Sequence, residues 1–304
     1  MSTETSTGTD TGSGTTPAVA TAAAATVPVT RSAAARSGSV AKLWGPPLVV
    51  FAVIVAAWIA LAAILDASPP HVLLPSPLRI VVDSFSTETL DGQPNQPITG
   101  ELLNAIALTM QVALSGLAIS IVVGIVWAIL MSQARWVERS LFPYAVILQC
   151  VPILALVPLI GNTIDYGIEA RILVCVLISL FPMVSNTLFG LQSVERSQRE
   201  LFKLQKASRW TVLTKLQLPN ALPAIFAGMR ISAGLAIVGA IVGDFFFRRG
   251  QPGLGILISN YQSRLQTPEL FAAVIVAALL GVLIFLIFGW ISKLAVGRWY
   301  EPAS

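Results

Sequence analysis

Apolar residues along the chain fall into six long blocks separated by shorter polar stretches. A helix needs about 20 predominantly apolar residues to cross the hydrocarbon core of a membrane. The blocks cover residues 46–66, 102–131, 141–161, 169–191, 221–246 and 270–295. Each is long enough to span, so the pattern predicts an all-α polytopic membrane protein with about six transmembrane helices.

Two blocks depart from a simple span. Block 102–131 is longer than a membrane requires, so its helix must tilt or project from the bilayer. Block 141–161 contains Gln149 and three prolines. Neighbouring helices can satisfy the carbonyl groups that proline leaves unbonded. We therefore expect this helix to be kinked and packed among other helices rather than facing lipid.

Residues 1–40 have a different composition from the rest of the chain. Ser, Thr, Gly and Ala dominate, and the segment has no aromatic residue and no hydrophobic period. Such a segment buries too little apolar surface to offset the entropy lost on ordering. We predict a disordered tail over residues 1–40, without a signal peptide, followed by one transmembrane domain over residues 41–300.

Composition supports the membrane assignment. The 304 residues are 55% hydrophobic and 11% charged, whereas a soluble domain is about 25% charged. One His and two Cys leave no material for a zinc cluster, a disulfide framework or a Cys/His catalytic centre. We expect no metal and no cofactor.

Basic residues predict the orientation in the membrane. With the N-terminus placed in the cytoplasm, 13 of the 19 Lys and Arg residues fall on the cytoplasmic side. The five assigned to the outer side are Arg79, Arg171, Arg248, Arg249 and Arg264. The positive-inside rule thus predicts a multi-pass protein of the cell membrane with both termini in the cytoplasm.

The basic face suits anionic lipid headgroups and partner proteins. A nucleic-acid-binding protein would instead carry a basic patch interleaved with exposed aromatic residues on a soluble module. The sequence has no such module, so we expect no nucleic-acid partner.

The longest polar stretch on the predicted cytoplasmic side is segment 192–220. It reads as two short helices, about 194–206 and 209–216. In the first, Glu195 and Arg199 are spaced for an ion pair one turn apart. Ser208 is placed to cap the second helix, and Pro219 and Pro223 then mark entry into the next span.

Two interpretations of this segment are open on physical grounds. A charged amphipathic helix beside a membrane can lie on lipid headgroups, or it can dock a cytoplasmic protein. Leu201 and Leu204, with Phe202 beside them, form the apolar ridge that either role needs.

The segment resembles the cytoplasmic loop signature of binding-protein-dependent ABC transporter permeases. That signature is Glu-Ala-Ala, three residues, Gly, nine residues, Ile, one residue and Leu-Pro. The matching positions here are Glu200, Leu201, Phe202, Lys206, Leu216, Leu218 and Pro219. Residues 222–232, LPAIFAGMRIS, also resemble the family's continuation into the next helix.

The resemblance implies the fold of a type I ABC importer permease (MetI-like). In that family the short helix sits in a groove of a separate ATPase and moves with it. It implies that Glu200 is the signature residue of the docking segment, with Leu201, Phe202 and Leu204 as its hydrophobic contact. It also implies a cytoplasmic ATPase dimer, an external solute-binding protein and a homodimer of permeases in lipid as partners.

Two positions depart from the signature. Leu-Phe replaces Ala-Ala, and Lys206 replaces Gly. Glycine is favoured where a helix ends in the left-handed conformation, and another residue there costs about 1 kcal/mol. Either the helix ends differently here, or the partner's socket accepts a bulkier, more basic residue.

Two further motifs resemble one branch of the family, the permeases for nitrate, sulfonates, taurine and thiamine-pyrimidine precursors. They are the run 74–77, Leu-Pro-Ser-Pro, and the run 253–255, Gly-Leu-Gly. An acidic residue precedes Gly-Leu-Gly in that branch, and Asp244 is the candidate here. The resemblance implies import of a small polar or anionic solute, either sulfonate-like or nitrate-like, or pyrimidine-like or riboflavin-like.

The chain lacks the chemistry of an ATPase. A phosphate-binding loop needs the pattern G-x-x-x-x-G-K-[S/T], which the sequence does not contain. We therefore expect no enzyme activity in this subunit and ATP hydrolysis on a partner.

Polar side chains inside the predicted spans are candidates for a solute pathway. Gln149 and Asn186 are the pathway candidates, although such residues also form hydrogen bonds between helices. For Arg230 we expect a structural role, bound to carbonyl groups or lipid phosphate. Gly239 and Gly243 permit close helix packing, either within the subunit or across a dimer.

Two other classes of membrane protein fit the sequence less well than an importer permease. An ion-coupled secondary transporter or channel usually carries carboxylates inside its spans or internal repeats, whereas Asp66 and Asp244 lie at span ends. A membrane enzyme would have to use His71, the one histidine, which has no Cys, Asp or second His partner nearby.

Overall fold

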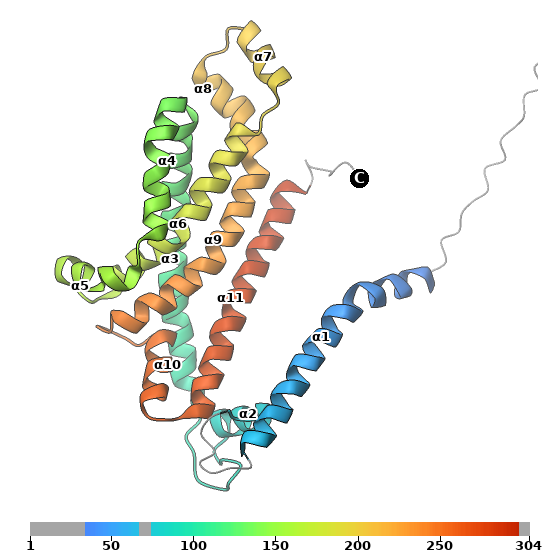
Figure 1. Ribbon diagram of the computed structural model, residues 1–304, viewed down its shortest axis with the longest axis vertical. Helices are drawn as coiled ribbons and strands as arrows, with labels where there is room; N and C mark the ends of the chain where they lie inside the picture. The colour runs from blue at the N-terminus through green and yellow to red at the C-terminus, as the bar shows by residue number, and fades with distance from the viewer. Residues whose placement is uncertain (1–33, 67–73, 298–304) are drawn as a thin grey trace, which may run out of the picture. The chain divides into compact units, whose positions relative to one another are not determined.

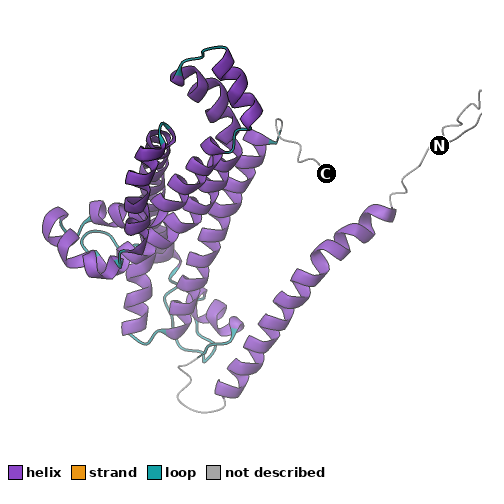
Figure 2. Cartoon of the chain, turned by 45° about the horizontal axis from the view of Figure 1, so that its top comes forward, coloured by secondary structure: helices purple, strands orange, loops and turns teal. Residues whose placement is uncertain are grey.

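The computed structural model describes residues 34–66 and 74–297, and its long regular elements are all helices (Figures 1 and 2). Within those ranges, strand-like pairing is limited to one isolated bridge between Glu88 and Pro94. The predicted tail lies mostly outside the described residues, and so does His71. Helix α1 begins at Ala34, within the last residues of the predicted tail.

The helices follow the hydrophobic blocks closely. Their bounds are α1 Ala34–Asp66, α2 Pro77–Phe85, α3 Thr99–Ser132, α4 Arg135–Cys150, α5 Ile153–Ile164, α6 Ile168–Gln192, α7 Arg196–Leu204, α8 Arg209–Val212, the π-helical turn η1 Leu213–Gln217, α9 Leu218–Phe246, α10 Leu254–Ser263 and α11 Thr267–Val296. Among the described residues, five of these helical runs are long and apolar enough to cross a membrane, and α4 with α5 can form a sixth, broken span. The prediction of about six spans is confirmed if the bent pair α4 and α5 is counted as one span.

The third predicted span is broken rather than kinked. Helices α4 and α5 meet at an angle of 96°. The break lies at Val151 and Pro152, where proline cannot donate the next helical hydrogen bond. The expected packing among other helices is confirmed in part: α4 packs against α3 and α6 and buries Ala145, and α5 packs against α6, whereas Leu154 of α5 is 61% exposed.

Helix α6 occupies the centre of the bundle, with α3 and α9 packed against it. Glycines allow this close approach. A Cβ atom at Gly116 of α3 would lie 2.5 Å from Cys175 Sγ, and one at Gly239 of α9 would lie 2.8 Å from Cys175 Cα. A Cβ at Gly243 would lie 3.1 Å from Arg171 Cα. Gly239 and Gly243 therefore serve packing within the subunit, which answers the alternative left open by the sequence.

Buried hydroxyl groups add polar links between the same three helices. Ser120 and Ser179 share a hydrogen bond of 2.7 Å, and Ser232 Oγ donates to the carbonyl oxygen of Ser179 at 2.8 Å. All three side chains are buried. Such bonds fix the relative positions of α3, α6 and α9, because a buried hydroxyl without a partner is costly.

The Leu-Pro-Ser-Pro motif begins helix α2. Ser76 is the N-cap, and its Oγ accepts a hydrogen bond from the Arg79 N–H at 3.3 Å. Pro77 occupies the first turn, where a missing N–H costs nothing. This motif has a local structural role in starting α2.

Helices α8, η1 and α9 form one continuous run over Arg209–Phe246. The second short helix was predicted to end at residue 216, and that boundary is wrong. Pro219 lies in the first turn of α9, directly after the wider π-helical turn. A π turn inside a longer helix accommodates a local change in hydrogen bonding, so the chain continues helically through the proline.

We predict that Gly239→Ala lowers the stability of the bundle by about 1–3 kcal/mol, because the new Cβ overlaps the backbone of Cys175. The measurement is the temperature at which the purified chain loses half of its monodisperse fraction in detergent. Gly234→Ala in the same helix is the control, since its Cβ would meet nothing closer than 3.9 Å. Equal effects of the two substitutions would contradict the close approach of α9 to α6.

Candidate functional site

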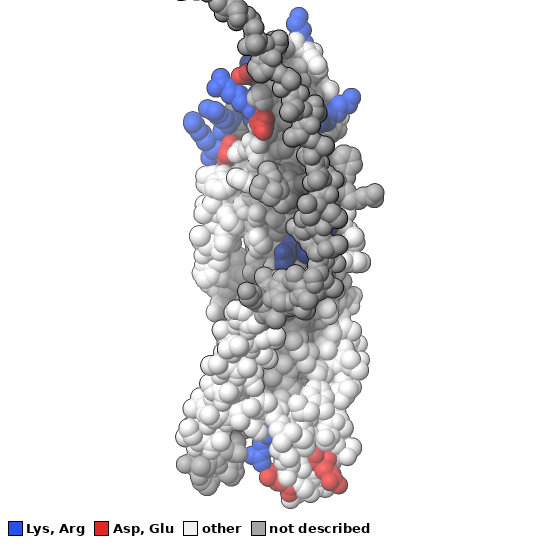
Figure 3. All heavy atoms as spheres, turned by 90° about the vertical axis from the view of Figure 1, so that its right-hand side faces the viewer, with Lys and Arg blue, Asp and Glu red and all other residues white. Residues whose placement is uncertain are grey.

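The polar segment predicted to dock a partner lies at one end of the bundle. Helices α7 and α8 occupy this end, whereas α2 and α10 lie at the other (Figure 1). Lys and Arg side chains gather around the α7 end on the face drawn in Figure 3, and a broad, mostly uncharged band separates them from the opposite end. This distribution matches a segment that projects from the apolar part of the chain.

Helix α7 is shorter than predicted, and its ion pair differs. It begins at Arg196, so Glu195 precedes the first helical turn and does not pair with Arg199. Instead Arg196 Nε lies 2.9 Å from Glu200 Oε1. Arg199 Nη2 donates to the carbonyl oxygen of Gln192 at 2.8 Å. That bond satisfies a carbonyl at the end of α6, so it ties α7 to the helix before it.

The apolar ridge of α7 is exposed. Leu204 is 82% exposed, Leu201 is also exposed, and Phe202 is half-buried. Trp210 at the start of α8 is 72% exposed and was not predicted as part of this surface. Large exposed apolar side chains on a polar segment mark a site of interaction. The sequence feature that could have indicated this exposed tryptophan is its place in the first turn of a short polar helix, directly after Ser208 and Arg209.

Lys206 ends α7 in the left-handed conformation, with φ of 52°. The Ala207 N–H donates to the Phe202 carbonyl oxygen at 3.0 Å, which closes the end of the helix. The backbone therefore adopts the conformation that glycine favours, even though lysine occupies the position. The helix therefore ends in the usual left-handed conformation despite the replacement of glycine by Lys206. The explanation that remains is a partner socket that accepts a bulkier, more basic residue.

The remaining signature residues lie on the helix that follows. Ser208 caps α8, as predicted, because its Oγ accepts from the Thr211 N–H at 3.2 Å. Leu216 is half-buried in η1, and Pro219 is exposed in the first turn of α9. These two residues shape the run into α9 rather than the face of α7.

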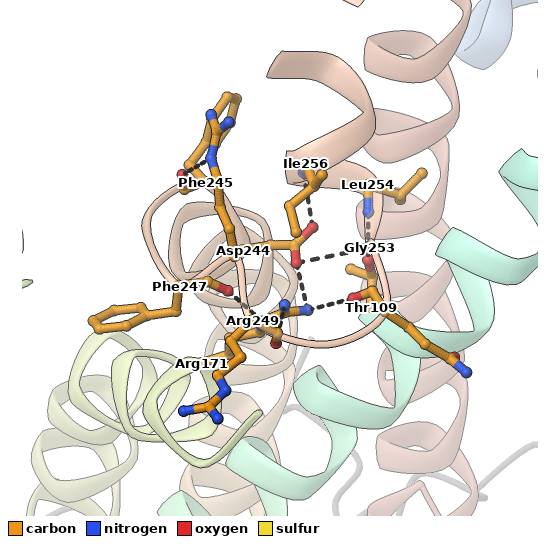
Figure 4. A network of polar contacts seen from close by, with 11 residues as sticks. Thr109, Arg171, Asp244, Phe245, Phe247, Arg249, Gly253, Leu254 and Ile256 are labelled. Atoms are coloured by element: carbon orange, nitrogen blue, oxygen red, sulfur yellow. Dashed lines mark hydrogen bonds and ion pairs between the residues drawn. The ribbon is translucent and has the colours of Figure 1, made fainter. Parts of the chain in front are cut away.

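A buried ion pair lies toward the opposite end of the bundle. Arg171 Nη1 of α6 is 2.6 Å from Asp244 Oδ1 of α9, and the two side chains are only 2% and 3% exposed. The Arg171 guanidinium also donates to three carbonyl oxygens of the loop after α9, those of Phe247 at 2.7 Å, Arg249 at 3.0 Å and Gln251 at 3.0 Å. Arg171 thus holds this loop against α6 (Figure 4).

Asp244 binds the beginning of α10 with the same carboxylate. Asp244 Oδ2 accepts from the Ile256 N–H at 2.9 Å, and Oδ1 accepts from the Gly253 N–H at 3.4 Å. Thr109 Oγ1 of α3 accepts from the Leu254 N–H at 3.0 Å (Figure 4). A carboxylate beside the N–H groups of a helix start is favourable for both.

The Gly-Leu-Gly motif is required by this close approach. A Cβ at Gly253 would lie 2.7 Å from Asp244 Oδ2, and a Cβ at Gly255 would overlap the carbonyl oxygen of Ile241. Asp244 is therefore the acidic partner of the motif, as expected from the sequence. We refer to Arg171, Asp244, Thr109 and the start of α10 as the α10 anchor.

The charge count places Arg171 in an outer segment, and in the structure this residue is part of helix α6 rather than of a loop. Arg171 lies in the first turn of α6 and is buried. Arg171 can be buried in the bundle because Asp244 on the neighbouring helix α9 provides its counter-charge. The charged residues at this end are Glu169 and Arg171 of α6 and Asp244 of α9, and the sequence does not show which of them pair.

The two pathway candidates, Gln149 and Asn186, lie on different helices. Gln149 is exposed in the last turn of α4. Asn186 Nδ2 donates to the carbonyl oxygen of Pro182 at 2.8 Å, and its Cβ lies where Gly228 leaves room on α9. The hydrogen bond of Asn186 stays within α6, and its contact at Gly228 places the side chain between α6 and α9. These positions do not converge on one site.

Arg230 has a different partner from the one expected. Its guanidinium carbon lies 3.9 Å from the ring centroid of Phe285 on α11, a cation–π contact. Its Nε is buried and has no hydrogen-bond partner among the described residues, so the expected carbonyl bond is absent there. Gly289 leaves the space for the guanidinium, because a Cβ there would lie 3.0 Å from Nε.

Within residues 34–66 and 74–297 no group of three or more His, Cys, Asp and Glu side chains is arranged to hold a metal ion. The described chemistry is that of ion pairs, capped helices and an exposed apolar ridge. It suits binding and mechanical coupling.

Comparisons with known proteins identify relatives of the chain. The family described as "Binding-protein-dependent transport system inner membrane component" matches residues 120–299. The formylaminopyrimidine transport permease protein ThiX of Halalkalibacterium halodurans is 34% identical over 213 residues, 70% of this chain and 80% of that protein. The riboflavin transport system permease protein RibX of Chloroflexus aurantiacus is 34% identical over 168 residues, 55% of this chain and 62% of that protein.

A solved structure shares the fold. The crystal structure of an amino acid ABC transporter with histidines aligns with a TM-score of 0.50 and 18% sequence identity, over 66% of this chain and 94% of that one. The expected fold is confirmed by this match and by the helical architecture.

We predict that Asp244→Asn destabilises the chain by about 3–5 kcal/mol, because it leaves the Arg171 charge buried without its counter-charge. Thermal loss of the monodisperse fraction in detergent measures the effect. Asp165→Asn is the matched control, since Asp165 pairs with Arg249 at an exposed site, where such a pair contributes about 1 kcal/mol or less. An equal loss for both variants would contradict the structural importance of the α10 anchor.

We also predict that Lys206→Gly slows hydrogen exchange of the α7 amides, because glycine relieves about 1 kcal/mol of left-handed backbone strain. Lys203→Gly should have the opposite effect, since Lys203 lies inside the helix, where glycine costs about 1 kcal/mol. Hydrogen exchange measured by mass spectrometry on peptides covering α7 compares the two variants. Faster exchange in both would show that Lys206 is not strained.

Proposed function

The chain belongs to the family of inner-membrane components of binding-protein-dependent transport systems, and from this premise we propose how its parts act in the membrane-spanning permease subunit of an ABC importer. ATP is hydrolysed by a separate cytoplasmic ATPase dimer. An external solute-binding protein delivers the solute, and two copies of this permease form a homodimer in the lipid bilayer. Both termini face the cytoplasm.

The observation that carries this proposal is the exposed ridge on α7 and α8. Leu201, Leu204 and Trp210 are solvent-exposed on a segment that also carries Lys and Arg side chains. Exposed apolar side chains of this size favour a protein partner over solvent. Glu200, held by Arg196 at 2.9 Å, adds a charged group of defined position to the same helix.

Each signature residue then has a role in contacting the ATPase or in transmitting its motion. Leu201 and Leu204 enter the groove of the ATPase, and half-buried Phe202 supports them from within the segment. Lys206 turns the chain from α7 into α8 and presents a basic group beside the groove. Leu216 and Pro219 link the docked segment to α9.

The continuous run Arg209–Phe246 provides the mechanical connection. Its 38 residues correspond to a length of about 57 Å at the usual helical rise. One end follows the docking helix α7, and the other carries Asp244 and the α10 anchor. A movement of the ATPase that displaces α8 is thereby transmitted through α9 to α10, which is how ATP binding at one side opens the pathway at the other.

The solute is small and polar or anionic. Relatives named for formylaminopyrimidine and riboflavin transport support a pyrimidine-like or riboflavin-like solute, and the wider branch extends the range to sulfonates and nitrate. Gln149 and Asn186 are the pathway candidates, and Arg230, bound over Phe285, has a structural role that a lipid phosphate can complete.

The geometry does not favour an ion-coupled secondary transporter or channel. Such a protein needs a carboxylate that can exchange its ion, whereas Asp244 is held by Arg171 and by backbone N–H groups. The carboxylate is committed to the α10 anchor. The importer therefore accounts better for the intramembrane charges.

We predict that Leu204→Asp, in a tagged chain co-expressed with its ATPase, abolishes co-purification of the ATPase and lowers ATP-dependent uptake to background. The charge is placed in the middle of the docking contact, where desolvation disfavours it. Leu90→Asp is the control, because Leu90 is also exposed but lies in the loop after α2. Retention of the ATPase by Leu204→Asp and by the double variant Glu200→Arg/Phe202→Ala would overturn the docking role.

A further inference from the structure

An open cavity lies at the end of the bundle that holds α10, opposite α7. Its volume is about 420 Å³, and it lies between the start of α3, the loop before α10 and the second half of α10. Six polar side chains line it: Glu101, Asn104, Gln251, Asn260, Tyr261 and Arg264. Pro252 and Leu257 complete the lining. This volume is in the lower part of the range of small-molecule sites.

Tyr261 and Glu101 form the defined polar pair of the cavity. The Tyr261 hydroxyl donates to Glu101 Oε2 at 3.2 Å. Burial of Tyr261, together with the charge of Glu101, raises the pKa of the phenol, so the hydroxyl remains a donor. Only one Glu101 oxygen is engaged, and Glu101 has no ion pair among the described residues. The carboxylate can therefore accept a hydrogen bond from a ligand.

Donors and acceptors surround this pair. Asn104, Gln251 and Asn260 each present a carboxamide, which offers both a carbonyl oxygen and an N–H₂ group. Arg264 adds a guanidinium, which donates only. The cavity thus holds one negative and one positive side chain together with three groups that can bind either kind of partner.

The walls of the cavity are held in place by the α10 anchor. Asp244 and Thr109 bind the N–H groups at the start of α10, and Arg171 binds the carbonyl oxygen of Gln251. Side chains on fixed elements lose little freedom when a ligand binds. The cavity is accordingly preorganised on two of its sides.

We propose that this cavity is a receiving site for the transported solute, and that it selects a small solute without net charge whose hydrogen-bond donor faces Glu101 and whose acceptor faces Arg264. An anion would gain the contact with Arg264 but would be placed beside the Glu101 carboxylate, and like charges at close range repel. The proposal rests on the proposed function, because the solute is the one that this permease moves.

Two kinds of solute share this chemistry: a neutral amino-heterocycle, such as a formylaminopyrimidine, and a zwitterion, such as taurine. The heterocycle uses its amino group as donor and a ring nitrogen as acceptor. The zwitterion presents its ammonium group to Glu101 and its sulfonate to Arg264. Methanesulfonate and nitrate have the acceptor alone.

Equilibrium binding to the full chain in lipid nanodiscs tests the proposal with formylaminopyrimidine, taurine, methanesulfonate and nitrate as probes. We expect formylaminopyrimidine or taurine to bind at least about tenfold more tightly than either anion. Glu101→Gln should weaken that preferred probe about tenfold and strengthen methanesulfonate. Glu88→Gln is the control, since it removes an exposed carboxylate from the loop between α2 and α3 without touching the cavity.

Arg264→Gln distinguishes the two kinds of solute, the neutral amino-heterocycle and the zwitterion. It should weaken taurine more than formylaminopyrimidine, because the sulfonate depends on the guanidinium charge. Glu101→Asp keeps the charge, so it should retain the preference over anions even where Glu101→Gln loses it. An elution profile like that of the unaltered chain shows that each variant is folded.

Tighter binding of an anion, equal effects of Glu101→Gln and Glu88→Gln, or no binding of any probe at about 10 mM would each overturn the proposal. The assay contains no ATPase and needs no transport. If the docking proposal fails, the binding affinities measured for the four probes can still be interpreted. If solute binding is lost, co-purification of the ATPase is unaffected, so the two proposals are tested independently.

Discussion

The ion pair between Arg171 and Asp244 is the interaction on which the α10 end of the bundle depends. It joins the start of α6 to the end of α9 at 2.6 Å in a buried site. Arg171 also donates hydrogen bonds to the loop after α9, and Asp244 also accepts hydrogen bonds from the start of α10. A buried charge requires such a complete set of partners, so one pair determines the position of a loop, a short helix and one wall of a cavity.

The two ends of the bundle are joined by a single helical run. At one end α7 exposes an apolar ridge, and at the other Asp244 binds α10. Between them, α9 packs against α6 through Gly239 and Gly243. Packing without bulky side chains brings the helix backbones close together. One helical run therefore connects the exposed ridge of α7 to the α10 anchor.

Features set by local residue order were predictable. The spans and the cap formed by Ser208 follow from apolar length and short-range hydrogen bonding, whereas the left-handed conformation at Lys206 was one of two alternatives that the sequence left open. Features set by contacts between helices were not. The contact of Arg230 with Phe285 depended on the approach of α11 to α9. The pairing of Arg196 with Glu200 is local to α7, and it was missed because the helix begins at Arg196 rather than near residue 194.

The sequence by itself determined the class of the protein, because about 20 apolar residues in a row have one stable environment, and the spacing of Glu200 to Pro219 identified the family signature. Only the tertiary structure decided how the few charges are used. Arg171 and Asp244 are 73 positions apart in the chain, and no local rule relates them. Their pairing, and the cavity beside α10 that depends on it, exists because antiparallel packing of α6 and α9 brings the two helix ends together.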